Sequence, residues 1–281
     1  MITVPELVAG SVGDFLSDYM SPRFDFSDGP LVQMVPAIAR LALECIGNSD
    51  ALYHNVEHTM LVTMAGHDIM RGRALNAHMT ASDYAHVILA CLSHDIGYVR
   101  GVVVGDGPEG FVINAKGDRV KLPRGSSDAA LLPYHVDRSK LYALDRFKSF
   151  DFLDPERIAR AIEGTRFPME LAGNAEPLGE EAAILRAADL IGQLGDPHYL
   201  RKATALYYEF EEAGINRQLG YDSPADLINK YPQFYWNSVA PHVQTAIGYL
   251  NVTASGRQWI ANLYANVFRA EREITLSGPQ H

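Results

Sequence analysis

The sequence predicts one all-α domain with a small β-hairpin insertion around residues 101–125. Apolar residues recur at helical spacing along most of the 281-residue chain, and capping residues followed by proline mark several helix starts. A single glycine-rich stretch interrupts this pattern. No internal repeat or low-complexity linker divides the chain, so we expect one domain over residues 1–281.

The first predicted helices follow from apolar spacing and from one capping motif. Apolar side chains at positions 31, 35, 38, 42 and 45 lie on one helical face. A second helix is expected over residues 55–71. The run Thr80-Ala-Ser-Asp83 forms a capping box, which predicts the start of a third helix.

Proline after a capping side chain predicts the starts of three later helices. These pairs are Asp154-Pro155, Asp196-Pro197 and Ser223-Pro224. Another helix is expected over residues 180–193. Residues 232–274 predict two long helices with a bend near Pro241 or Gly256.

The insertion at residues 101–125 is predicted from glycine content and from two short strand-like runs. Phe111-Val-Ile-Asn and Arg119-Val-Lys-Leu flank a Lys-Gly-Asp turn. Because this segment directly follows the histidine-rich part of the chain, we expect it to contribute to the rim of a site.

Composition and charge exclude several classes of protein. The formal net charge is −10, which argues against binding to a nucleic-acid polymer or an anionic membrane, since both need a basic face. No segment is expected to span a membrane, and residues 1–18 lack the basic stretch of a signal peptide. Cys45 and Cys91 lie in apolar helical patterns and are interpreted as core residues, so we expect a cytoplasmic protein.

Six of the ten histidines lie between positions 54 and 94. His58 is near the start of its predicted helix and His94 is near the end of the next one. If the two helices pack antiparallel, both histidines return to the same level, because each helix covers about 20 Å at 1.5 Å per residue.

Asp95 and Asp189 complete a candidate metal site. Asp95 continues an apolar helical stripe and is predicted to point inward, where a carboxylate is costly unless it is paired or bound to metal. Asp189 lies among small residues that allow a close helix approach. With His58 and His94, these groups suit a divalent metal, and we assign the metal site to a core of residues 51–195. N-terminal helices in residues 1–50 and C-terminal helices in residues 196–275 flank it.

Three ordered motifs resemble the HD-domain metal-dependent phosphohydrolase superfamily, and the resemblance is nearest to its cyclic-nucleotide phosphodiesterase branch. The motifs are Tyr53-His54-Asn55-Val56-Glu57-His58, His94-Asp95 and Ala188-Asp189-Leu190. The resemblance spans about residues 30–270 and implies a single HD-domain helical bundle.

The resemblance also implies a mechanism. His58, His94, Asp95 and Asp189 would bind one divalent metal, and Asp95 would bridge to a second that is held mainly by water. Water acidified by the cations would attack phosphorus, and His54 would act as the general acid for the leaving group. Manganese, iron, zinc, cobalt and magnesium all remain open as the metal.

Substrate contacts are less clearly indicated. Tyr98 stands where the family often has another histidine, and it joins Tyr53 and His135 as a candidate contact. Gln244 is the candidate for reading a purine, although Ile247 stands where an aromatic residue is expected. The implied substrate is a small phosphorylated molecule, with a cyclic or other nucleotide among the options. The sequence does not determine the oligomeric state, and a homodimer is one option.

Several other interpretations remain. The first alternative function is an HD-type di-iron oxygenase, for which His135 would supply a second-metal ligand. The other is a non-catalytic, metal-stabilised signalling scaffold.

Arg138 and Lys140 are expected on a solvated helix face, with phosphate contact as the alternative. His67 and His86 are expected to be structural or solvated.

Overall fold

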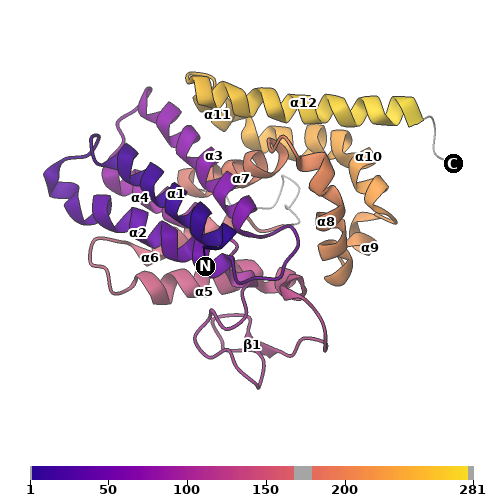
Figure 1. The fold of residues 1–281 in the computed structure, drawn as a ribbon, viewed down its shortest axis with the longest axis horizontal. Helices are drawn as coiled ribbons and strands as arrows, with labels where there is room; N and C mark the ends of the chain where they lie inside the picture. The colour runs from indigo at the N-terminus through magenta and orange to yellow at the C-terminus, as the bar shows by residue number, and fades with distance from the viewer. Residues whose placement is uncertain (1, 168–178, 278–281) are drawn as a thin grey trace.

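The computed structural model describes residues 2–167 and 179–277, which form a helical bundle with one small hairpin. This confirms the predicted all-α class. In Figure 1, α12 runs along one edge of the molecule and the hairpin projects from the opposite side. The helices of the first half are α1 (Val4–Met20), α2 (Gly29–Ile46), α3 (Val56–Ala74), α4 (Ala81–Ser93), α5 (His135–Phe147) and α6 (Pro155–Glu163).

The second half of the chain adds the remaining helices. These are α7 (Glu180–Leu194), α8 (Tyr199–Glu212), α9 (Ile215–Leu219), α10 (Pro224–Phe234), α11 (Ala240–Leu250) and α12 (Ala254–Ser277). Short 3₁₀ turns lie at Phe26–Asp28, Ile96–Tyr98 and Asp128–Tyr134, and a π-helical turn at Tyr235–Val239 joins α10 to α11. The predicted C-terminal breaks near Pro241 and Gly256 both occur, at the starts of α11 and α12.

Side-chain caps begin three of the helices whose starts the sequence predicted. The Thr80 hydroxyl accepts a hydrogen bond from the Asp83 amide at 3.0 Å, and the Asp83 carboxylate accepts from the Thr80 amide at 3.0 Å. Asp154 and Ser223 cap α6 and α10 by accepting from the amides of Arg157 and Asp226, without a return bond. Each cap satisfies amides that the helix itself leaves free.

The start predicted at Asp196-Pro197 is wrong by two residues, because α8 begins at Tyr199. The Asp196 carboxylate accepts from the His198 amide at 2.8 Å and pairs with Lys202 at 2.6 Å. A carboxylate that bonds the amide two residues later closes a local turn instead of capping the following helix.

Close packing of α7 on α3 and α4 builds the centre of the bundle. A Cβ atom at Gly192 would lie 2.8 Å from the backbone nitrogen of Val62, and one at Gly66 would lie 2.6 Å from the Cys91 sulfur. Only glycine permits these approaches. The predicted close approach of the helix that carries Asp189 is therefore confirmed, and Cys91 is a fully buried core residue.

The expectation that no segment is long and apolar enough to cross a membrane is wrong for α2. By length and composition only, Gly29–Ile46 meets that criterion, with 18 residues and a mean hydropathy of 1.3. Core helices meet it too, and α2 packs against α1 and α4.

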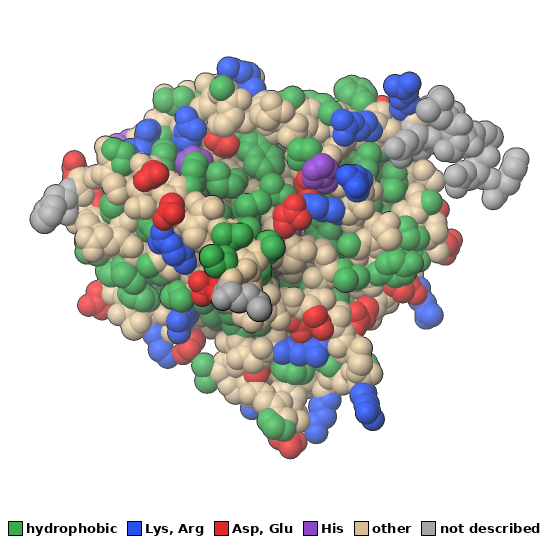
Figure 2. Space-filling model, in the orientation of Figure 1, with side chains coloured by type: hydrophobic (Ala, Val, Ile, Leu, Met, Phe, Trp, Pro, Cys, Tyr) green, Lys and Arg blue, Asp and Glu red, His purple; other side chains and the backbone are tan. Residues whose placement is uncertain are grey.

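On the face of the molecule shown in Figure 2, basic and acidic side chains are interspersed among apolar ones.

The hairpin segment is held to the bundle by Arg138, which corrects the expected solvated position of this residue. Strands β1 (Phe111–Val112) and β2 (Arg119–Val120) pair antiparallel, with Phe111 opposite Val120. Arg138 is fully buried on α5, and its guanidinium donates to both oxygens of Asp106 at 3.0 and 2.9 Å. It also donates to the carbonyls of Gly97, Val99 and Val112 at 2.6, 2.9 and 2.6 Å.

These contacts use all five donor hydrogens of the guanidinium. Asp106 in turn accepts from three backbone amides of the same segment, at Gly101, Val103 and Val112. Burial opposes ionisation of Asp106, but the bonds from Arg138 and the amides outweigh it and lower the pKa of this carboxyl. The ion pair is therefore the internal anchor of the insertion.

His67 has the structural role expected for it. Its ring is buried between α1 and α4, and its Nδ1 atom shares a hydrogen bond with the Tyr84 hydroxyl at 2.7 Å. Burial, helped by the nearby arginines 71 and 23, lowers the pKa of His67 from 6.5 to about 3. The ring is therefore neutral in the folded protein at neutral pH.

We expect Arg138→Met to destabilise the protein by about 3–5 kcal/mol, because it leaves a buried carboxylate and three carbonyls without their donor. Lys140→Met on the same helix is the control. Lys140 pairs with Glu163 at a partly exposed position, and its loss should cost about 0–1 kcal/mol. Urea unfolding measures both values. Equal, small losses would show that the buried ion pair does not anchor the insertion.

The neutral His67 predicts a pH dependence of stability. In the unfolded chain His67 binds a proton near pH 6.5, but in the folded protein only near pH 3. The contribution of neutral His67 to the free energy of unfolding is therefore complete above pH 6.5 and decreases as the pH falls towards 3. The decrease should approach about 1.4 kcal/mol per pH unit. His67→Asn keeps an acceptor for Tyr84 but cannot titrate, so its free energy of unfolding should fall less steeply between pH 6 and 4. Parallel curves for both proteins would contradict this assignment.

Candidate metal centre

Three helices bring the predicted ligands together. His58 lies in the first turn of α3, where the Asn55 side chain caps the amides of Glu57 and His58 at 2.9 and 3.3 Å. His94 ends α4 and Asp95 follows it. Asp189 comes from α7. The predicted antiparallel return of His58 and His94 to one level is confirmed, since both rings meet the same two carboxylates.

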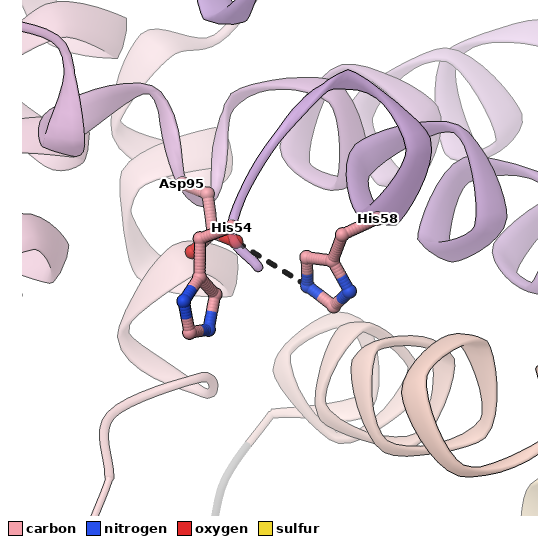
Figure 3. A group of neighbouring side chains, drawn as sticks. All are labelled: His54, His58 and Asp95. Atoms are coloured by element: carbon pink, nitrogen blue, oxygen red, sulfur yellow. Dashed lines mark ion pairs between the residues drawn. The ribbon is translucent and has the colours of Figure 1, made fainter. Parts of the chain in front are cut away.

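The four side chains converge at short distances. His58 Nε2 lies 3.3 Å from Asp95 Oδ2 and 3.3 Å from Asp189 Oδ1. His94 Nε2 lies 3.1 Å from Asp95 Oδ2 and 3.7 Å from Asp189 Oδ1. Figure 3 shows the His58 ring facing the Asp95 carboxylate, with the His54 ring beside it. Metal–ligand bonds of about 2.1 Å put neighbouring ligand atoms roughly 3.0–3.4 Å apart, so this spacing suits a metal ion.

The side-chain atoms that converge in the cluster are mostly not used in ordinary hydrogen bonds among the described residues. His94 Nδ1 donates to the Cys91 carbonyl at 2.7 Å, which turns His94 Nε2 towards the carboxylates. Such a bond from the far ring nitrogen is typical of metal-binding histidines. Both nitrogens of His58, Nε2 of His94 and Oδ2 of Asp95 are buried and lack an ordinary hydrogen bond within the described residues. A cation would satisfy several of these atoms at once.

The electrostatics of the cluster favour positive charge. Burial opposes protonation of His58, but the carboxylates of Asp189 and Asp95, each 3.3 Å from its Nε2 atom, outweigh it and raise the pKa of His58 to about 10. Burial likewise opposes ionisation of Asp95, yet His94 and His58 hold the pKa of this carboxyl well below its usual range. The buried Asp95 and the partly exposed Asp189 thus favour positive charge beside them, and a divalent metal could supply that charge in place of protons.

His54 lies beside the cluster and is oriented by Glu209 of α8. His54 Nδ1 makes a short hydrogen bond with Glu209 Oε2, and Glu209 Oε1 accepts from the amides of Tyr53 and His54 at 2.6 and 3.2 Å. Burial would raise the pKa of Glu209, but His54 and these amides outweigh it and lower the pKa. The His54 ring is thus fixed, with Nε2 as its unengaged nitrogen.

Sequence reasoning missed Glu209, which is 99% buried. The residue lies between Tyr208 and Phe210 on α8. An acid at a buried helical position was the available signal, because such a carboxylate requires a partner. The partner lies 155 residues away, and only the fold identifies it.

Tyr98 and His135 form the other side of the site. The Tyr98 ring stacks against both His54 and His135, at centroid distances of 4.8 and 4.6 Å, and the two histidine centroids lie 6.5 Å from each other. His135 Nδ1 donates to the Leu132 carbonyl at 2.6 Å, and its Nε2 lies 3.7 Å from Asp95 Oδ1. Burial lowers the pKa of His135 and raises that of Tyr98 well above its usual range, so both rings are neutral at neutral pH.

A cleft opens from the cluster towards α7, α8 and α10. His54, Asp95, Tyr98, His135 and Asp189 line its inner end. The hairpin strands contribute no side chain to the lining that the structure describes, so the expected rim role of this segment is not seen.

Two predicted contacts lie outside this cleft. Gln244 is exposed on α11 and is not part of the lining, whereas Gln193 on α7 is. Tyr53 belongs to a hydrophobic cluster with Ala203, Leu206 and Leu227. Its ring centroid lies 5.3 and 5.4 Å from those of His54 and His58, and its amide donates to Glu209. The candidate purine contact at Gln244 is therefore not brought to the metal cluster.

We expect the Asp189→Asn substitution to remove bound metal while the chain remains folded, because it replaces a charged ligand with a neutral amide. Asp196→Asn is the control, since it makes the same substitution at a buried carboxylate that pairs with Lys202 instead of the cluster. Elemental analysis of both variants and of the wild type, purified without chelators and then loaded with manganese or zinc, measures the difference. Equal metal content in the two variants, or none in any protein, would contradict the assignment.

Comparison with known proteins identifies a family without naming an activity. Residues 8–273 match the model of the family described as Npun_R2479-like. No curated protein and no solved structure gives a significant match to the chain. The matched range includes His54, all four predicted metal ligands and Glu209. Because the match covers most of its length, the chain belongs to the Npun_R2479-like family.

Proposed function

We propose that this protein is a metal-dependent phosphohydrolase that cleaves a small phosphoester or phosphodiester. The observation that carries the proposal is a buried set of unpartnered histidine and carboxylate atoms at the inner end of a cleft, with an oriented histidine next to it. The motif resemblance to HD-domain phosphohydrolases supports the same reaction class.

His58, His94, Asp95 and Asp189 are the residues that would hold a divalent metal. A bound metal would supply an acidified water and neutralise charge on phosphoryl oxygens. The two carboxylate oxygens of Asp95 face different histidines. Its Oδ2 faces His58 and His94, and its Oδ1 faces His135. A second cation near Oδ1 would therefore find His135 within reach.

His54 is proposed as the general acid. Its Nδ1 is occupied by Glu209, so the nitrogen that can deliver a proton to a leaving oxygen is Nε2. The stacked ring of Tyr98 holds the imidazole plane from one side. Glu209 is then a positioning residue, which acts through His54.

The test is turnover of a substrate panel with and without metal. We expect hydrolysis of bis-p-nitrophenyl phosphate, p-nitrophenyl phosphate, AMP or cyclic AMP that EDTA abolishes and manganese restores. His54→Gln should lower kcat by about 10²–10⁴-fold while metal content stays unchanged. The exposed His78→Gln is the control and should keep full activity. Absence of metal-dependent turnover on every compound would reject the proposal.

A second candidate, the di-iron oxygenase, is favoured by the position of His135. Its Nε2 is unprotonated and faces Asp95 Oδ1, as a ligand of a second metal would. This candidate predicts two iron equivalents per chain and consumption of dioxygen with ferrous iron, without phosphate release. Bound metal with neither reaction would favour the signalling scaffold instead.

A further inference from the structure

The far part of the cleft differs in character from its inner end. Its lining is mostly aromatic and aliphatic and is contributed by α8, α9, α10 and the residues between them. We call this surface the aromatic wall, and it consists of Leu206, Phe210, Leu219, Tyr221, Leu227, Tyr231 and Phe234. The Tyr231 hydroxyl, which is buried without a partner among the described residues, is one polar exception. A surface of this kind binds apolar or aromatic groups by burial and ring contact.

Two polar side chains of the cleft lining, Thr165 and Arg166, are already engaged within the protein. The Thr165 hydroxyl donates to the Ile162 carbonyl at 2.9 Å. Arg166 is held by Asp137 at 2.9 Å and by Glu163. These groups have their donors committed and are poorly placed to read the polar edge of a nucleobase.

Arg186 is different, because part of its guanidinium is available. Its Nε donates to the Gly164 carbonyl at 2.6 Å, while its two terminal nitrogens have no partner among the described residues. The side chain lines the cleft and is half-buried. Arg186 precedes Asp189 by three residues on α7, so the two lie on one face, about 4.5 Å apart along the helix axis.

The charges around Arg186 leave its positive charge incompletely balanced. Burial lowers its pKa and the nearby Asp189 opposes that shift, but Asp189 is committed to the metal cluster. His242 of α11 also feels the charge of Arg186. A half-buried guanidinium with free terminal donors is a strong binding group for a phosphoryl oxygen.

We infer that the substrate is a phosphoester of a bulky apolar or aromatic alcohol, with its anionic group bound by Arg186 and its alcohol portion lying against the aromatic wall. The inference rests on the proposed phosphohydrolase function and adds the substrate class. It places selectivity in the wall and in Arg186 instead of in a glutamine that reads a base. Gln244, which is exposed outside the cleft, has no part in it.

Binding of phosphonates, which cannot be hydrolysed as esters, tests the inference separately from catalysis. We would titrate the manganese-loaded protein with methylphosphonate, 1-naphthylmethylphosphonate and AMP by calorimetry. The naphthyl compound should bind at least about tenfold more tightly than methylphosphonate, because it buries a ring system on the wall. It should also bind more tightly than AMP. Equal affinities for the two phosphonates, or tighter binding of AMP, would overturn the inference.

Two variants assign the two parts of the site. Arg186→Met should weaken binding of both phosphonates by about tenfold or more, whereas Arg160→Met, which removes an equal charge at an exposed position, should not. Phe210→Ala should reduce the preference for the naphthyl compound and leave methylphosphonate affinity unchanged. Circular dichroism and thermal unfolding check that each variant is folded. Unchanged binding in a folded Arg186→Met protein would overturn the role of Arg186.

The outcomes for function and for substrate class are distinguishable. If the phosphonates bind as expected but no phosphoester is hydrolysed, the wall and Arg186 form a ligand site and the proposed reaction is wrong. If the protein hydrolyses phosphoesters with metal but shows no preference for an apolar alcohol portion, the proposed reaction stands and the substrate class is wrong.

Discussion

The site depends on how closely α7 can approach α3. At Gly192 the two backbones are too near for any side chain, and at Gly66 the Cys91 sulfur fills the space that a side chain would need. This approach brings Asp189 within 3.3 Å of His58 Nε2. A side chain at Gly192 would force α7 away from α3 and with it Asp189 from His58, whereas one at Gly66 would press on Cys91 of α4. Small residues on α7 are thus a geometric requirement of the ligand set as well as of the core.

Two buried histidines and the buried Asp95, beside the partly exposed Asp189, form an unfavourable group unless their charges are balanced. The two carboxylates raise the pKa of His58 despite its burial, which favours a proton on this ring. Both nitrogens of His58, Nε2 of His94 and Oδ2 of Asp95 are also left without ordinary hydrogen bonds among the described residues. If such a cluster holds a metal, binding would release protons and add to stability, because the metal would replace the positive charge of those protons.

The helices that follow α7 give the cluster its chemical surroundings. Glu209 on α8 orients His54, and the same helix contributes Phe210 to the aromatic wall. Helix α8 therefore both positions the candidate acid and shapes the cleft. On the opposite side, the Arg138–Asp106 pair holds the inserted segment against α5 without adding a side chain to the described cleft lining.

Local sequence signals determined the helical class, the caps at Thr80, Asp154 and Ser223, and the four side chains that converge, which are His58, His94, Asp95 and Asp189. These features depend on spacing along one chain segment and on the need to neutralise an inward carboxylate. Only the tertiary structure decided the roles of Glu209, Arg138 and Arg186. Their charges look like ordinary helix-surface charges until distant segments bury them, because the partners of Glu209 and Arg138 lie 155 and 32 residues away and Arg186 faces a cleft built by later helices. Gln244 lies exposed outside the cleft. Helical spacing alone does not reveal which face of α11 the fold leaves exposed, so the sequence could not show this.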